Sequence, residues 1–114
     1  MRDCSLYLKD ILHAIESIEA FVEGMDFEAY QADDKTASAV VRKLEIIGEA
    51  VKQLPEEVTR LYPDIPWKQV AGMRDKLIHF CFGVDPALIW QTVCNRLPAL
   101  KSTIREMLAD HAAP

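Results

Sequence analysis

The chain has 114 residues, of which 50% are hydrophobic and 27% charged, and its formal net charge is −5. This length suits one domain with a buried core, and the acidic balance argues against a protein that coats nucleic acid through clustered lysines and arginines. No apolar run reaches the roughly 20 residues that span a bilayer, and no signal peptide is recognisable, so we expect a cytoplasmic protein without a membrane anchor.

The first half of the chain predicts two long amphipathic helices. The first begins near Asp3 or Ser5 and ends at Gly24, and a short helical turn follows at 27–32. Asp34 is expected to cap the second long helix, which ends before Pro55. On both helices hydrophobic residues recur every three or four positions, which predicts one buried stripe on each. The stripes are Leu8, Ile11, Leu12, Ile15, Ile18 and Val22, and then Val40, Leu44, Ile47, Val51 and Leu54. Gly48, in the middle of the second helix, is expected to let another helix or Trp67 approach closely, because a mid-helix glycine otherwise costs about 1 kcal/mol relative to alanine.

Prolines divide the second half of the chain into shorter elements. Pro55 opens a short helix through Leu61, residues 62–66 form a rigid connector, and Trp67 begins a helix that breaks at Gly83. We expect Trp67 and Trp90 to be core or interface anchors, as the size and mixed polarity of tryptophan favour.

The last helix is predicted to start at Asp85 and Pro86, with Val84 and Ile89 as a hydrophobic staple. Pro98 should kink this helix, because proline removes one backbone hydrogen bond and crowds the preceding turn. The buried stripe of the helix is Trp90, Val93, Leu97, Leu100, Ile104 and Leu108. No segment predicts a strand. We therefore expect an all-α fold, an antiparallel bundle with short extra helices, as a single domain over residues 1–114.

The cysteines predict neither a disulfide framework nor a metal site. Cys4, Cys81 and Cys94 are odd in number and far apart, with no CxxC pair. This pattern indicates free thiols in a reducing compartment. Glu45 and Glu49, one helical turn apart, lack a histidine ligand at helical spacing, so a salt-bridged face is the better interpretation. We expect no metal and no other cofactor.

Arg74 and His79 are the residues that most suggest chemistry. A guanidinium holds phosphate through its planar fork, and an imidazole moves a proton near neutral pH. Five residues place the two side chains about 140° apart around a helix and about 7.5 Å apart along it. Asp75 beside Arg74 either orients it or is simply exposed. The plain alternative is that Arg74 pairs with Glu45 or Glu49 and His79 caps the helix end.

A homodimer is a requirement of the catalytic interpretation. Cleavage of RNA by the 2′-hydroxyl needs a base, an acid and stabilisation of charge on the phosphate. One chain offers only His79 in this region, since His13 lies off the apolar stripe and His111 is in the polar tail. Two copies of the 67–82 helix side by side would supply two histidines and two arginines.

Several short stretches, spread in order over nearly the whole chain, form a recognisable set. They are Tyr7–Leu12, Leu44–Ala50, Pro63–Trp67, Ala71–His79, Phe82–Asp85 with Ile89–Trp90, and Asn95–Lys101. Together they resemble the HepT-like toxin family of the HEPN superfamily, and the set is far more specific than the Arg–His spacing.

The resemblance implies a HEPN-type helical homodimer that acts as a metal-independent ribonuclease. The family motif is arginine, four residues, histidine, one residue and tyrosine, and Arg74 and His79 match its first two positions. The resemblance also implies a protein partner, a minimal nucleotidyltransferase antitoxin of the MntA type that silences the toxin by transferring AMP to the motif tyrosine.

This chain departs from the motif at its third position, where Cys81 replaces the tyrosine. A thiol lacks the reach of the phenol and is not the hydroxyl that adenylyl transfer would use. Cys81 is then either inert packing or, beside a cation that makes it a thiolate, a redox-sensitive position. The ribonuclease interpretation depends on Arg74 and His79 and survives this change.

The sequence therefore predicts the toxin of a toxin–antitoxin pair, a homodimeric ribonuclease in which Arg74 binds the scissile phosphate and His79 transfers protons. Two alternatives stay open. One is a non-catalytic HEPN dimer that binds RNA or a nucleotidyltransferase through the same cleft, which the negative net charge and Cys81 favour. The other is a purely structural dimerisation subunit.

Overall fold

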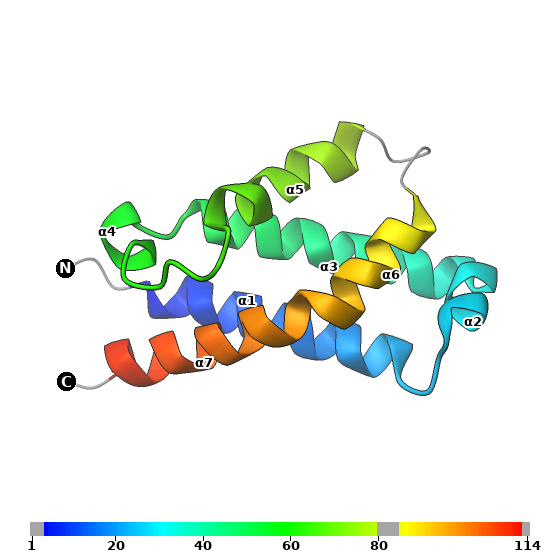
Figure 1. Ribbon diagram of the computed structural model, residues 1–114, viewed down its shortest axis with the longest axis horizontal. Coiled ribbons are helices and arrows are strands. Elements are labelled where there is room, and N and C mark those ends of the chain that lie inside the picture. The colour runs from blue at the N-terminus through cyan, green and yellow to red at the C-terminus, as the bar shows by residue number, and fades with distance from the viewer. Residues whose placement is uncertain (1–3, 80–84, 113–114) are drawn as a thin grey trace.

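The protein is a bundle of α-helices, as the sequence predicted (Figure 1). The computed structural model describes residues 4–79 and 85–112, and at positions 78, 79, 111 and 112 it describes the backbone alone. Within these ranges there is no strand. The helices are α1 (Ser5–Val22), α2 (Phe27–Ala32), α3 (Asp34–Lys52), α4 (Glu56–Thr59), α5 (Trp67–His79), α6 (Pro86–Asn95) and α7 (Leu97–Ala112).

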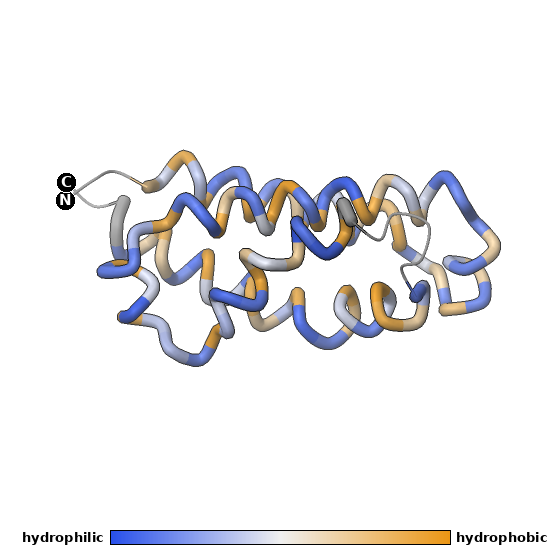
Figure 2. The backbone as a smooth tube through the Cα atoms, turned by 90° about the horizontal axis from the view of Figure 1, so that it is seen from above, coloured by the Kyte–Doolittle hydropathy of each residue, from blue (hydrophilic) through white to orange (hydrophobic). Residues whose placement is uncertain are grey.

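The core lies where α1, α3 and α7 pack together, and α5 lies on α3. Hydrophobic and hydrophilic segments alternate along the helices, as the helical period requires (Figure 2). The predicted stripe on α3 is buried throughout, and those on α1 and α7 are buried at most positions. Leu12, Val22, Trp90 and Leu108 are only partly buried, whereas Tyr30 and Met107, which the periodicity did not single out, are fully buried.

Most helix boundaries follow the capping residues. The Asp85 carboxylate accepts a hydrogen bond from the Ala87 nitrogen at 2.9 Å, and Pro86 is the first residue of α6, which confirms the predicted start. The cap of α3 was predicted one residue too late. Asp33, not Asp34, accepts from the Thr36 nitrogen at 3.0 Å, and this bond lowers the pKa of the Asp33 carboxyl. Gly24 follows α1 with φ of 78°, the left-handed backbone expected of a stop signal. Val84, proposed for the staple, lies outside the described residues.

Two predictions in the second half are corrected. α4 is shorter than expected, because Pro55 is its extended N-cap and the helix ends at Thr59 instead of Leu61. Beyond Thr59 the backbone hydrogen bonds are of the tighter i to i−3 kind, from Leu61 N to Val58 O and from Tyr62 N to Thr59 O, so the α-helix is not continued. The predicted single last helix is in fact two helices, with the break at Arg96. Pro98 cannot donate to the carbonyl four residues back, and the helix is interrupted at Arg96, two residues before the proline that was expected to kink it.

The connector between α4 and α5 is tied to the bundle at both ends. The Tyr62 hydroxyl donates to Asp110 Oδ2 on α7 at 2.6 Å, and the Trp67 Nε1 donates to the Tyr62 carbonyl at 2.9 Å. Burial of the phenol, together with the Asp110 carboxylate, raises the pKa of Tyr62 to about 12. Trp67 packs against the core, and Trp90 stacks near Tyr30 with ring centroids 5.1 Å apart, so both tryptophans are anchors as predicted.

No helix of the described chain is both long enough and apolar enough to cross a membrane.

Candidate active site

Gly48 fixes where α5 lies on α3. A Cβ atom built at position 48 would lie 3.0 Å from the backbone nitrogen of Arg74 and 3.0 Å from the carbonyl oxygen of Val70. Both neighbours are backbone atoms, which cannot move aside as a flexible side chain can. The mid-helix glycine was expected to allow a close approach, and the structure identifies the approaching element as α5. The glycine therefore sets the position of Arg74 directly.

Arg74 is partly exposed and only loosely paired. Its Nε lies 3.8 Å from Glu49 Oε2 on α3, and its Nη1 lies 3.6 Å from Asp75 Oδ1, with 39% of the arginine side chain exposed. Neither contact reaches hydrogen-bond distance, and pairs this exposed contribute about 0–1 kcal/mol. These weak ion pairs leave the guanidinium able to bind an anion.

The carboxylates around Arg74 settle two sequence-based alternatives. Arg74 pairs with Glu49, whereas Glu45 pairs with Arg42 at 3.2 Å. The two glutamates therefore do not form a joint acidic pair. Asp75 is exposed, and its carboxylate lies 3.6 Å from Nη1 of Arg74, so an orienting role for it stays a prediction. The pairing with Glu49 is compatible with a catalytic arginine, because a carboxylate of this kind can orient a guanidinium before phosphate binds.

His79 is the last residue of α5, one and a half turns beyond Arg74. The described backbone therefore carries both positions on one rigid helix. The orientation of the imidazole is not among the described features, and Cys81 lies outside the described residues. His13 is exposed on α1.

A cavity of about 300 Å³ lies between α1 and α3 and is lined in part by Glu49. Tyr7, Asp10 and Gln53 line it together with Glu49. The phenol of Tyr7, the carboxylates of Asp10 and Glu49 and the carboxamide of Gln53 therefore lie around one cavity. Glu49 is also the carboxylate that pairs with Arg74. The sequence did not assign a role to Asp10. Asp10 lies one turn beyond Tyr7 and off the buried stripe of α1, and this position was the only sequence feature that could have suggested a role. Which helix lies opposite Asp10 depends on packing. In the described part of the chain no three His, Cys, Asp or Glu side chains form a metal-binding group.

Comparison with known proteins identifies the family. The model of the ribonuclease HepT-like family matches residues 11–107. A protein of Thermococcus cleftensis named "Probable ribonuclease HepT" is 50% identical over 101 residues, which cover 89% of this chain and 92% of that protein. The chain belongs to the HepT-like family of the HEPN superfamily.

Two further relatives come from other organisms. "Putative RNase MJ0127" of Methanocaldococcus jannaschii is 44% identical over 109 residues, covering 96% of this chain and 90% of that protein. A similarly named protein of Caldanaerobacter subterraneus subsp. tengcongensis is 46% identical over 102 residues, covering 90% and 91%. No solved structure matches the chain.

Proposed function

We propose that this protein is a metal-independent endoribonuclease that acts as a homodimer and serves as the toxin of a toxin–antitoxin pair. The observation that carries the proposal is Arg74. The close approach at Gly48 sets the backbone position from which Arg74 extends, and within the described residues its guanidinium is paired through long, exposed ion pairs. The three relatives described above, which are named probable ribonuclease or putative RNase, support the same reaction.

In the proposed reaction the Arg74 guanidinium binds the scissile phosphate and stabilises the charge that develops on it. One His79 takes the proton of the 2′-hydroxyl as its oxygen attacks phosphorus. The bond from phosphorus to the 5′-oxygen then breaks, and the second His79, from the partner subunit, protonates the leaving oxygen. The products are a 2′,3′-cyclic phosphate and a free 5′-hydroxyl. Neither redox chemistry nor a metal enters this scheme.

The test is incubation of purified protein with total RNA in EDTA. Each variant at a proposed catalytic residue is compared with a control variant at a surface residue of the same type. Arg74→Ala should abolish cleavage, whereas Arg105→Ala should not, because Arg105 is a comparable surface arginine that lies 3.7 Å from Glu16. His79→Ala should likewise be inactive, and the exposed His13→Ala should retain activity. Equal cleavage by His79→Ala and wild type would refute the enzyme proposal.

The dimer is tested by mixing subunits. When wild type and His79→Ala subunits are unfolded together in equal amounts and refolded, random pairing makes about a quarter of the dimers fully wild type. If both histidines are needed, activity falls to about that fraction of an all-wild-type sample. A fall to only half would mean that each subunit works alone.

A second function is favoured by the net charge of −5 and by Cys81 in place of the motif tyrosine. In this alternative the chain is a non-catalytic HEPN dimer that binds RNA or a minimal nucleotidyltransferase. It predicts RNA binding that persists in His79→Ala, fails in Arg74→Ala, and is accompanied by no cleavage by wild type.

A further inference from the structure

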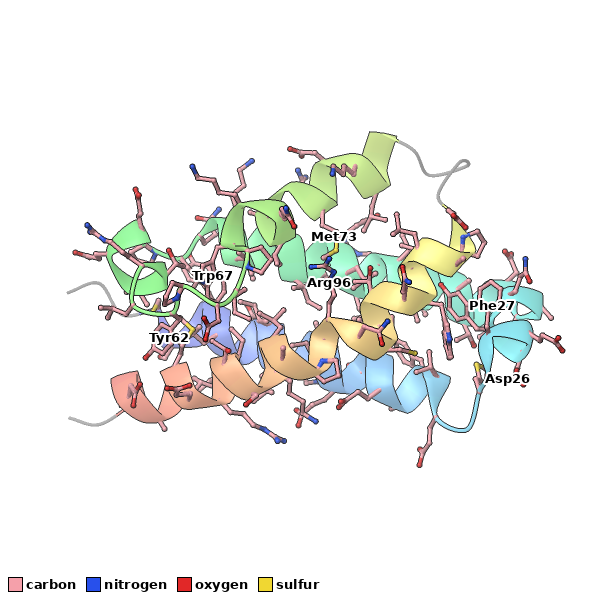
Figure 3. All side chains as sticks on the ribbon, viewed as in Figure 1. Asp26, Phe27, Tyr62, Trp67, Met73 and Arg96 are labelled. Carbon is pink, nitrogen blue, oxygen red and sulfur yellow. The ribbon has the colours of Figure 1, made fainter. Side chains whose placement is uncertain are left out.

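An open groove of about 730 Å³ lies between the end of α3, α4 and the start of α5, away from the Glu49 cavity. Its apolar lining includes Leu54, Ile65 and Trp67, and its cationic lining consists of Lys52, Arg60 and Lys68. Figure 3 shows Trp67 at the start of α5, beside the connector that carries Tyr62. None of the features described so far uses this groove.

The charge of the groove is opposite to that of the chain. Three cations and one carboxylate, Glu56, line it, whereas the whole chain has a net charge of −5. Lys52, Arg60 and Lys68 are exposed, and no carboxylate within the described ranges lies within 4.0 Å of their charged nitrogens. Some cations elsewhere are paired, as at Lys101 and Glu19, 2.7 Å apart, and others, such as Lys9, Lys35 and Lys43, also have no carboxylate of the described residues within 4.0 Å. What distinguishes Lys52, Arg60 and Lys68 is that they line one groove together. Cations gathered without partners around a concavity match an anionic ligand.

The apolar lining of the groove indicates which class of anionic ligand would fit it. Trp67 is partly buried and its indole nitrogen is bonded to the Tyr62 carbonyl at 2.9 Å, so the ring is held in place before any ligand arrives. An ordered aromatic ring beside unpaired cations is the composition of sites that bind single-stranded nucleic acid, where bases contact the ring and phosphates contact the cations. A base paired in a duplex is not available for such contact.

We propose that this groove binds a segment of single-stranded RNA upstream or downstream of the cleaved bond, with phosphates on Lys52, Arg60 and Lys68 and a base against the Trp67 wall. This proposal deepens the ribonuclease function and rests on it. Positions 68 and 79 lie eleven residues apart on α5, which is about three turns, so they share a face of the helix about 16 Å apart. A strand that crosses the Arg74 and His79 positions can therefore continue along α5 into the groove.

The first experiment measures binding of a labelled single-stranded RNA oligomer to His79→Ala protein as a function of salt. The groove variant is Lys52→Gln, Arg60→Gln and Lys68→Gln together. The control is Lys9→Gln, Lys35→Gln and Lys43→Gln together, which changes the net charge equally but leaves the groove intact. We expect the groove variant to lose at least tenfold in affinity, and its plot of log affinity against log salt to become shallower by about 2. The control should keep the slope of the parent protein.

The second experiment measures the fluorescence of Trp67, which lines the groove. The chain has two tryptophans, so Trp90→Phe leaves Trp67 as the only indole. Its emission should change saturably with the single-stranded oligomer, and much less with a duplex of the same sequence. Equal affinities of the groove and control variants would overturn the proposal, as would Trp67 emission that stays constant while RNA binds. Loss of a protein partner with RNA binding unchanged would assign the groove to that partner and overturn the proposal as well.

The experiments distinguish failure of the groove proposal from failure of the catalytic proposal. Wild type that binds RNA through the groove but cuts none in EDTA refutes only the cleavage. Wild type that cuts RNA, with the groove variant showing the same KM on a long oligomer, refutes only the groove.

Discussion

Replacement of Gly48 by alanine tests how α5 is positioned. The added Cβ would lie 3.0 Å from the Arg74 nitrogen and the Val70 oxygen and 3.3 Å from the Arg74 Cβ, so α5 must move away by a few tenths of an ångström. Overpacking of this kind costs about 1–3 kcal/mol. Against it stands the gain of about 1 kcal/mol from replacing a mid-helix glycine with alanine.

Gly72→Ala is the matched control, because it isolates the packing cost. Gly72 lies on α5, two residues before Arg74, and an added Cβ there meets nothing within 4 Å. Both variants gain the same helix propensity. Gly48→Ala should therefore be less stable than Gly72→Ala by about 1–3 kcal/mol, the overpacking cost alone.

The assay is urea unfolding of both variants at one protein concentration, since oligomer stability depends on concentration. Under the proposed function, Gly48→Ala should also cleave RNA more slowly than Gly72→Ala, because Arg74 moves with α5. If Gly48→Ala equals or exceeds Gly72→Ala in stability, the close approach does not constrain the helix and the argument for a fixed Arg74 is lost.

Three further outcomes follow from particular contacts. Tyr62→Phe removes the bond to Asp110 and should cost about 1 kcal/mol in urea unfolding. Because the folded pKa of Tyr62 is raised to about 12, wild type should lose this stabilisation as pH rises above the ordinary tyrosine value of about 10, whereas Tyr62→Phe should show a flatter alkaline profile. Asp85→Ala should lower stability by about 1 kcal/mol through loss of the α6 cap, measured in the same way, and an unchanged midpoint would contradict the capping role. Cys81→Tyr should allow a minimal nucleotidyltransferase with ATP to add AMP, detected by intact mass, while wild type stays unmodified; modification of wild type would show that the tyrosine is not needed.

Sequence alone was sufficient for the all-α class, for most of the helices and for most of the core. The stripe Val40, Leu44, Ile47 and Val51 is buried because residues that recur every three to four positions must share a face of a helix. The start of α6 was equally predictable, since Asp85 and Pro86 act on their own first turn. The order of motifs was also enough to indicate the family, and the comparisons confirm it. The stripe and the start of α6 depend on residues close together in the chain, and the family on the order of motifs along it.

Tertiary structure decided which of these local features meet. Gly48 was recognisable as a site of close approach, but only packing shows that Val70 and Arg74 are its neighbours. The same holds for the choice of Glu49 over Glu45 as partner of Arg74, and for the cavity that joins Asp10 to Glu49. The cationic groove likewise draws residues from three helices that no local period relates. Contacts across the bundle depend on how helices rotate and cross, and those angles follow from the fit of whole surfaces, not from the spacing of residues along one helix.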